Sequence, residues 1–324
     1  MAYAVMTTGT RFSGKRRLAL ARLGAAALTA AGAAFARAAA DGSVGVSVAS
    51  VAEGVNRKPP ARVVVLDWPL TEVVLSLGVV PVGVSRPAWY AKLDGVPALP
   101  PSVVDTGLLY QPNFEVLAAL EPELIVITPW HAPLRGLLER IAPTLTVPLF
   151  GPGVDVYPAV QAATRKIADT LGRGAAADAL FAQADASFAE ARARLAGFRA
   201  TRRPVYLLRP IDDRHIAVFG RNSLFGGVLH ALGIDNAWQE DADPQGMTEA
   251  DLGALAKRTD AQVVTIGVPP GVAAQLARSP LWGALPFVRQ NRVQHIGPLP
   301  ALGGVVASMR CADSLAKALE GVST

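Results

Sequence analysis

The stretch VDTGLLYQPNFEVLAALEPELIVITP, residues 104–129, decides the fold of this chain. A glycine turn at Gly107 leads into an amphipathic run, which Asn113 can cap, and then into the apolar run Leu124-Ile125-Val126-Ile127. The segment Glu121-Pro122-Glu123 separates the two runs and ends the helix, because a residue before proline avoids the helical region. The pattern predicts a loop, a helix and a buried parallel strand.

Loops at the edge of a parallel sheet line ligand crevices, so we expect residues 108–111 and 128–132, which flank this unit, to border a ligand. Strands and helices alternate in both halves of the chain, and between them residues 158–203 show only helical periodicity. The expected strands are 63–66, 79–84, 103–104, 145–150, 205–209, 217–219, 262–266 and 293–296. The expected helices are 70–77, 134–141, 224–232, 249–256, 272–278 and 304–319, and residues 87–101 are expected to form a loop. This order predicts two α/β halves that flank a helical connector.

Several motifs, taken in their order along the chain, resemble the periplasmic binding proteins that deliver ferric siderophores and related metal chelates to ABC importers. They match the hydroxamate-siderophore branch and cover roughly residues 60–320. The motifs are Arg62–Trp68 with Glu72, Gly107-Leu108 with Pro112-Asn113-x-Glu115-x-Leu117, Arg140-Ile141-Ala142-Pro143, Phe219-Gly220-x-Asn222-Ser223-Leu224-Phe225, Gly233-Ile234-x-Asn236-Ala237-Trp238-Gln239 and Pro280-Leu281-Trp282. The resemblance implies an α/β fold of two Rossmann-like lobes joined by a long helical connector. This is the class III, helical-backbone type of periplasmic binding protein.

The expected organisation has five parts, from an N-terminal signal to a second α/β lobe. They are the signal peptide 1–40, a flexible leader 41–60, the N-terminal lobe 61–157, the helical connector 158–203 and the C-terminal lobe 204–324. The resemblance implies that the ligand binds in a cleft between the lobes.

The first 40 residues have the pattern of a cleavable secretory signal, with a basic head at 15–22, an apolar core at 23–35 and a small-x-small site at Ala36-Arg37-Ala38. Cleavage after Ala40 fits as well. The core is shorter than the roughly 20 residues of a membrane span. The pair Arg16-Arg17 resembles a twin-arginine signal, and an ordinary Sec signal fits equally. We therefore expect a periplasmic protein.

Removal of the signal changes the charge of the chain. Residues 1–40 carry six of the 31 Lys and Arg residues and no Asp or Glu, which leaves 25 basic against 26 acidic side chains. Nucleic-acid binding thereby loses its main support.

The single cysteine, Cys311, can form no internal disulfide and is expected to be a buried apolar side chain. The four histidines lie in separate segments without ligand spacing, so no metal site is expected.

Ferric hydroxamates enclose their iron in ligand oxygens, so a binding protein contacts those oxygens and carbon rather than the metal. Hydrogen-bond donors suit the oxygens and aromatic rings suit the scaffold. By resemblance, and because rings in loops favour binding over core packing, the expected ligand-binding residues are Trp68, Trp89, Tyr90, Leu109, Tyr110, Trp130, His131, Arg209, Gln245 and Leu302. Trp68 directly follows a strand, which also fits a core position.

Several positions depart from the ferrichrome-type pattern of the family. Leu109 stands where those relatives place an arginine, and His131 stands where they place a tyrosine that bonds the ligand. In the second lobe, two tryptophans and a tyrosine are replaced by Gln245, Pro300 and Leu302. The ligand is therefore expected not to be ferrichrome itself.

Replacement donors are expected in Tyr110, His131 and Arg209. Arg209 ends a strand, and its guanidinium offers five N–H donors to an oxygen-rich ligand. A solvated charge at a strand end fits this position equally well. His131 could instead be a surface turn residue.

The resemblance also implies one exposed carboxylate on each lobe, which meets arginines of an ABC permease at the inner membrane. Glu249 matches the second-lobe position. In the first lobe the aligned residue is Gly136, and Glu139 lies one turn later. Alternatively, Glu249 sits in the first turn of a helix and stabilises its dipole.

The sequence thus predicts a monomeric substrate-binding protein that captures a ferric siderophore, with no catalysis, no cofactor and no nucleic-acid partner. One alternative is the same fold binding haem, cobalamin or another metal chelate, and another is a partner-binding protein without a small ligand. A third is an exported α/β enzyme, although residues 220–223 lack the Gly-x-Ser-x-Gly nucleophile pattern.

Overall fold

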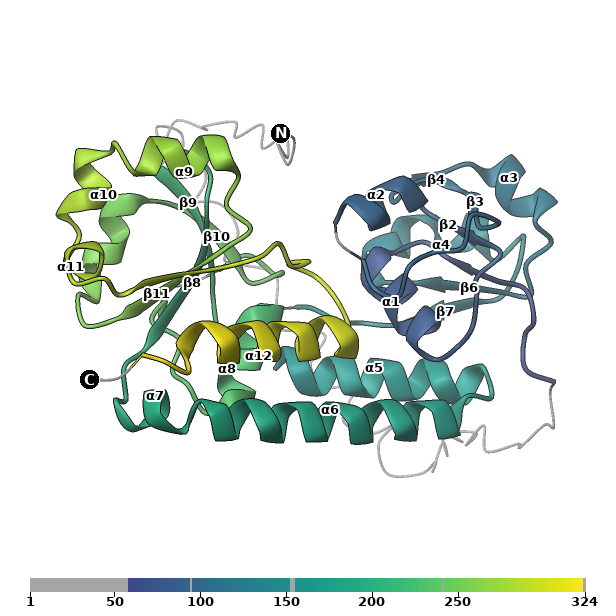
Figure 1. Ribbon diagram of the computed structural model, residues 1–324. Coiled ribbons are helices and arrows are strands. Elements are labelled where there is room, and N and C mark those ends of the chain that lie inside the picture. The colour runs from purple at the N-terminus through teal and green to yellow at the C-terminus, as the bar shows by residue number, and fades with distance from the viewer. Residues whose placement is uncertain (1–57, 94, 152–154, 241, 323–324) are drawn as a thin grey trace, which may run out of the picture. The chain divides into compact units, whose positions relative to one another are not determined.

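Figure 1 shows the computed structural model of the chain. It describes residues 58–93, 95–151, 155–240 and 242–322. The expected signal and all but the last residues of the expected leader lie outside these ranges. Within the described ranges, every helix is too short or too polar to cross a bilayer.

The N-lobe, which we define as residues 58–151, contains a five-stranded parallel sheet in the order β3-β2-β1-β6-β7. Its strands are β1 (Val63–Val65), β2 (Gly83–Val84), β3 (Val104–Asp105), β6 (Leu124–Ile127) and β7 (Thr144–Thr146). Its other elements are α1 (Trp68–Ser76), α2 (Pro87–Lys92), α3 (Phe114–Ala119), the 3-10 helix η1 (Pro129–Leu134), α4 (Arg135–Leu138) and the hairpin β4 (Gly107–Leu108) with β5 (Gln111–Pro112). The central strands β1 and β6 are buried along their whole length, which explains their unbroken apolar sequences.

The unit at residues 104–129 forms as predicted. The side chain of Asn113 caps α3 by accepting hydrogen bonds from the backbone N–H groups of Glu115 and Val116. Gly107 has a φ of 94°, which glycine adopts without strain, and it starts the hairpin before α3. The strand β6 then pairs in parallel with both β1 and β7.

The helical segment predicted between the halves is confirmed. It consists of α5 (Val156–Thr170), α6 (Gly174–Arg194) and the short α7 (Ala196–Ala200). The break between α5 and α6 contains Gly172 at a φ of 64°. Figure 1 shows α6 running beneath α5 and α12, and both of these helices pack against it.

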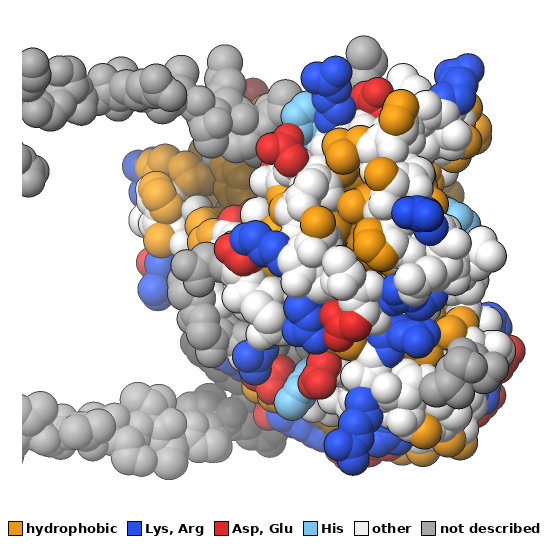
Figure 2. Space-filling model, turned by 90° about the vertical axis from the view of Figure 1, so that its left-hand side faces the viewer, with side chains coloured by type: hydrophobic (Ala, Val, Ile, Leu, Met, Phe, Trp, Pro, Cys, Tyr) orange, Lys and Arg blue, Asp and Glu red, His pale blue; other side chains and the backbone are white. Residues whose placement is uncertain are grey.

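The C-lobe, residues 204–322, contains a second five-stranded sheet in the order β10-β9-β8-β11-β12. Its strands are β8 (Val205–Pro210), β9 (His215–Phe219), β10 (Met247–Asp251), β11 (Gln262–Ile266) and β12 (Val293–Ile296). Its helices are α8 (Leu224–Leu232), the 3-10 helix η2 (Leu252–Lys257), α9 (Pro270–Leu276), α10 (Pro280–Ala284), α11 (Pro286–Arg289) and α12 (Val305–Leu319). Figure 2 looks onto the outer end of this lobe, where charged side chains of both signs surround apolar ones.

Two predictions about the type of local structure are wrong, and the strands predicted at 79–84 and 145–150 are shorter, at Gly83–Val84 and Thr144–Thr146. Residues 249–256 do not form a helix, because β10 pairs antiparallel with β9, with Glu249 opposite Ala217, and η2 follows. Hydrogen bonding to an open sheet edge overrides helical propensity there. The C-lobe sheet is mixed rather than fully parallel, because β9 runs antiparallel to both β8 and β10. Residues 87–101 are not all loop, because Pro87 starts α2, where its missing N–H costs nothing.

A buried carboxylate connects the N-lobe to the last helix. Glu72, on α1, is 3% exposed, and its Oε1 accepts a hydrogen bond of 3.0 Å from the backbone N–H of Ala307. The backbone N–H groups of Gly304 and Val306 also stabilise the charged carboxylate. Because α12 begins at Val305, Glu72 caps this helix from the other lobe.

Two glycines make this approach possible. A Cβ at Gly303 would lie 2.8 Å from Oε2 of Glu72, and a Cβ at Gly304 would lie 2.9 Å from its Oε1. Burial raises the pKa of Glu72 from its ordinary value of 4.5 to about 7, although the N–H donors and Arg310 act in the opposite direction.

The pH dependence of stability should therefore report this carboxyl group. Its pKa is higher in the folded than in the unfolded state, so the stability it contributes below pH about 4.5 is lost as the pH rises to about 7. The variant Glu72→Gln keeps an acceptor for Ala307 but cannot ionise, and it should flatten the stability profile over this window. Urea unfolding at a series of pH values measures the effect.

Two comparisons make this test specific. Burial also raises the pKa of Asp67 to about 7, and Asp67 is present in both proteins, so the difference between them isolates Glu72. Glu72→Ala removes the acceptor and should cost about 1–3 kcal/mol at every pH, because the N–H of Ala307 stays buried without a partner. Equal pH profiles for wild type and Glu72→Gln would contradict the assignment.

Candidate ligand-binding site

His131 joins two loops at the carboxyl edge of the N-lobe sheet. It lies in η1, after β6, and is fully buried, with Nε2 2.9 Å from the carbonyl oxygen of Leu109 in the β4–β5 hairpin. Its Nδ1 accepts from the backbone N–H of Thr128 at 3.3 Å and lies 3.0 Å from the hydroxyl of the same residue. Since Nδ1 accepts, the proton belongs on Nε2, which donates to Leu109.

The electrostatics of this histidine agree with that geometry. Burial lowers the pKa of His131, which favours the neutral ring that can donate at one nitrogen and accept at the other. The interpretation of His131 as a surface turn residue is wrong. Both ring nitrogens are used within the protein, so its ring holds the Leu109 loop in place, and direct contact with a ligand stays a prediction.

Three large apolar side chains lie exposed on the two joined loops. Tyr110 is 50% exposed, Trp130 45% and Leu108 44%. The ring of Tyr110 packs against that of His131, with centroids 5.5 Å apart and planes inclined by 44°. The predicted contacts Leu109, Tyr110, Trp130 and His131 are therefore brought together at this edge.

The other aromatic candidates of the N-lobe follow β1 and β2, whose carboxyl ends lie at the same edge. Trp68 starts α1, is half-buried, and donates its indole N–H to the carbonyl of Ser85 at 2.7 Å. Trp89 lies on α2, and the cations of Arg86 and Lys92 lie 5.4 and 5.2 Å from the centroid of its ring.

Tyr90 takes a different position. It is 3% exposed, and its hydroxyl donates to the carbonyl of Pro97 at 2.9 Å. The expectation that Trp89 and Tyr90 lie in an irregular loop is wrong, because α2 turns Tyr90 inward. Burial, followed by the nearby charge of Glu72, raises the pKa of Tyr90, which therefore stays protonated.

In the C-lobe, Arg209 lies near the carboxyl end of β8. Its Nε donates to the carbonyl of Ile266 at 3.3 Å, and one terminal nitrogen donates to that of Leu299 at 3.1 Å. Its guanidinium also lies 5.9 Å from the centroid of the Phe219 ring. Burial lowers the pKa of Arg209. Two of its five N–H groups are used in these bonds, so the desolvated guanidinium retains donors for a ligand.

The remaining second-lobe candidates do not all gather around Arg209. Leu302 is half-buried in the segment between β12 and α12, three residues after Leu299. Gln245 precedes β10, in which Met247 pairs with Phe219, whereas Arg209 pairs with Ala217. The register therefore places Gln245 toward the amino end of β8 and Arg209 toward its carboxyl end.

Both docking candidates are exposed. Glu139 accepts hydrogen bonds from Arg135 at 2.7 Å and Thr144 at 2.9 Å, and these bonds lower its pKa. Glu249 lies on β10, so the idea that it stabilises the first turn of a helix is wrong. The docking roles of both residues stay predictions.

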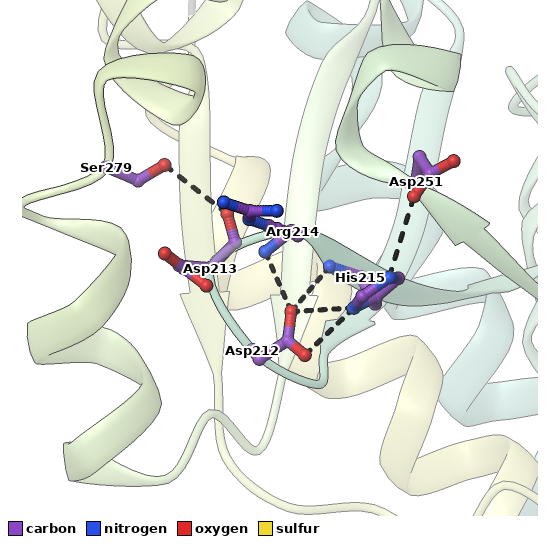
Figure 3. Close-up of polar contacts among 6 residues, drawn as sticks. All are labelled: Asp212, Asp213, Arg214, His215, Asp251 and Ser279. Atoms are coloured by element: carbon purple, nitrogen blue, oxygen red, sulfur yellow. Dashed lines mark hydrogen bonds and ion pairs between the residues drawn. The ribbon is translucent and has the colours of Figure 1, made fainter.

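Sequence reasoning missed a polar turn beside Glu249, which Figure 3 shows. Asp212 accepts from the backbone N–H groups of Arg214 and His215 at 2.7 Å, and its Oδ2 lies 2.9 Å from Nδ1 of His215. On the other side, His215 Nε2 lies 3.7 Å from Asp251. The hydrogen bond to Asp212 raises the pKa of His215, and the same contact lowers the pKa of Asp212 to about 2. The sequence did contain a signal for this turn, because Asp212 lies two residues before Arg214 and three before His215, a spacing at which an aspartate accepts backbone hydrogen bonds.

Comparison with known proteins identifies the family. The chain belongs to the periplasmic binding proteins, whose family model matches residues 63–299. Proteins of this family are substrate-binding components of transport systems, so the chain is a binding protein and not an enzyme, and the expected fold class is confirmed.

Three relatives show which members of this family the chain resembles. The iron(3+)-hydroxamate-binding protein FhuD of Escherichia coli (strain K12) is 33% identical over 263 residues, which cover 81% of this chain and 88% of the relative. The achromobactin-binding periplasmic protein of Dickeya dadantii (strain 3937) is 26% identical over 80% of this chain and 86% of the relative. Among solved structures, the Fe3+–Desferal-bound siderophore binding protein FhuD from Vibrio cholerae has a TM-score of 0.75 and 29% identity, and the match covers 83% of this chain and 100% of that one.

Replacement of His131 should separate the two N-lobe loops. His131→Phe keeps an aromatic ring but leaves the carbonyl of Leu109 and the N–H of Thr128 without their partner. We expect a loss of about 1–3 kcal/mol in the free energy of unfolding, measured by urea denaturation. The exposed His230 provides a matched control, since His230→Phe should change stability by less than about 0.5 kcal/mol. Similar small losses for both variants would show that the His131 bridge contributes little.

Proposed function

We propose that this protein is an exported substrate-binding protein that captures a ferric siderophore, of hydroxamate type, and delivers it to an ABC permease at the inner membrane. The similarity to the iron(3+)-hydroxamate-binding protein of Escherichia coli carries this proposal, because it spans 81% of the chain at 33% identity. The protein acts as a monomer in the periplasm, after cleavage of its N-terminal signal by the Sec or twin-arginine route. It needs no cofactor, since the iron arrives inside its chelate.

The side chains at the loop edges suit such a ligand. Tyr110, Trp130 and Leu108 offer apolar surface to the carbon scaffold of a siderophore. Arg209 offers charge-assisted hydrogen bonds to the oxygens that surround the iron, and its partial burial strengthens those bonds. Neither feature requires a protein ligand to the metal.

A fluorescence titration tests the proposal directly. Trp68, Trp89 and Trp130 lie in the elements that follow β1, β2 and β6 of the N-lobe sheet, so a bound coloured chelate should quench their emission. The purified protein is titrated with ferric hydroxamates, ferric catecholates and ferric citrate, with haem and cobalamin as controls. Saturable quenching by ferric hydroxamates is the expected result. Saturation by haem or cobalamin alone, or by none of the chelates, would contradict the proposal.

The same titration examines Arg209. Arg209→Ala should weaken hydroxamate binding roughly tenfold or more, because charge-assisted bonds to ligand oxygens are lost. Arg278→Ala, on an exposed arginine of the same lobe, should bind as wild type does. A thermal melt verifies that the Arg209 variant stays folded after losing its bonds to Ile266 and Leu299. Unchanged affinity in a folded variant would remove Arg209 from the site.

Docking to the permease can be tested separately from capture. Glu249→Arg reverses an exposed charge on the edge strand β10, so it should leave siderophore affinity intact and impair uptake in cells. Glu190→Arg, on the exposed face of α6, is the matched control and should support normal uptake. Normal uptake with Glu249→Arg would exclude the docking role, and equal impairment by both variants would indicate a general effect of charge.

A further inference from the structure

A small pocket lies at the amino edge of the C-lobe sheet, away from the candidate ligand site. It has a volume of about 130 Å³ and is formed by the end of α7, the turn that follows and the loop after α8. Strand β8 begins at Val205, directly after this turn, and at about 3.3 Å per residue about 13 Å of strand separate Val205 from Arg209. Figure 2 faces this end of the structure and shows Lys and Arg side chains, with some acidic neighbours, across its lower half.

Three arginines line the pocket: Arg199, Arg202 and Arg203. Among the described residues, none of their guanidinium groups donates a hydrogen bond or forms an ion pair. Asp235 is the acidic lining residue, so the pocket carries an excess of two positive charges. Like charges converging on one concavity repel each other, and this arrangement favours an anion that all three can share.

The backbone holds these arginines in place. Gly233, the cap residue of α8, has a φ of 72°, and a Cβ at this position would come within 3.0–3.3 Å of Nη2, Nε and Cζ of Arg199. The three distances are nearly equal, so the guanidinium lies flat against the glycine. The negative end of the α8 dipole stabilises one cation at this position, but it does not explain why three arginines line the pocket.

The turn between α7 and β8 directs the other two arginines. Arg202 has a φ of 53°, a left-handed conformation that is uncommon outside glycine, and the Thr201 hydroxyl accepts the backbone N–H of Arg203. Burial is the main cause of the lowered pKa of Arg292, and the positive charge of nearby Arg203 is the second cause. The positive field therefore extends beyond the pocket itself.

We propose that this pocket binds a phosphate group, supplied by inorganic phosphate or by the headgroup of an anionic lipid. Guanidinium groups recognise phosphate oxygens through paired N–H donors. At about 30 Å³ per water molecule, the pocket has room for several oxygen atoms and thus for a tetrahedral oxyanion. The excess of two positive charges matches a phosphate dianion.

Titration calorimetry with inorganic phosphate, at an ionic strength held constant with chloride, tests the site. Wild type should bind phosphate saturably, and the double variant Arg199→Gln/Arg203→Gln should bind it roughly tenfold or more weakly. Asp235→Asn removes the carboxylate that faces the anion and should bind phosphate several-fold more tightly. The double variant Arg140→Gln/Arg278→Gln removes two exposed arginines elsewhere and should bind as wild type does.

A second arm distinguishes the two sources of phosphate. Cosedimentation with vesicles of phosphatidylglycerol and phosphatidylcholine, compared with phosphatidylcholine alone, should show the same order of variants if the ligand is a lipid headgroup. Variant-dependent binding in either arm supports the site. Equal behaviour of wild type and the Arg199/Arg203 double variant in both arms would overturn it, and so would weaker phosphate binding by Asp235→Asn. A thermal melt of each variant excludes unfolding as the cause.

Discussion

The hydrogen bonds from the start of α12 to the Glu72 carboxylate fix where the C-terminal helix meets the N-lobe. Burying a carboxylate is costly, and here backbone N–H groups and the positive end of the helix offset part of that cost, although burial still raises the pKa of Glu72. Leu299 lies five residues before Gly304, the N-cap of α12, and its carbonyl accepts a hydrogen bond from Arg209. The segment between these anchors contains Leu302, so one buried carboxylate constrains the path of a predicted ligand-binding segment and the position of Arg209 together.

A second constraint operates within the N-lobe, where neutral His131 bridges the loops after β3 and β6. The bridge needs one donor and one acceptor on the same ring, and a protonated ring would direct a donor at the N–H of Thr128. Burial favours the neutral form, so geometry and electrostatics agree. The exposed apolar residues on these loops are held by a group that itself has no contact with solvent.

The parts of the fold that sequence could predict are those that local chemistry encodes. The bounds of α8, β11 and β12 agree with the predicted ranges. Helix α8 is a mostly apolar run between its N-cap Ser223 and its C-cap Gly233, and β11 and β12 have β-branched residues at several positions and end before Gly267 and Gly297. The strand β10 escaped prediction because its conformation depends on pairing with β9 across the chain, and its own residues favour a helix. Likewise, nothing near Glu72 in sequence indicates a partner 235 residues away.

The sequence indicated that Leu109, Tyr110 and His131 lie close together, but it did not indicate how these residues interact. Leu109 and His131 were singled out as departures from the family pattern, and sequence treated them as independent. The structure shows that the carbonyl of one is bonded to the ring of the other. Tyr90 was chosen by resemblance and because its segment was expected to form a loop, but the six-residue helix α2 turns its ring inward. Roles of this kind depend on side-chain direction, which spacing in a loop does not determine.

The paired departure has a chemical consequence for the proposed siderophore ligand. Where the family pattern has two polar contacts, this chain has a leucine whose carbonyl bonds a buried histidine, beside exposed Tyr110 and Trp130. The N-lobe edge therefore offers mainly apolar surface, and among the predicted contacts the strongest donor with N–H groups to spare is Arg209 of the C-lobe. A chelate that exposes carbon on one side and oxygen on the other would satisfy both. On this argument, we propose that the second lobe provides most of the recognition of the ligand's oxygens.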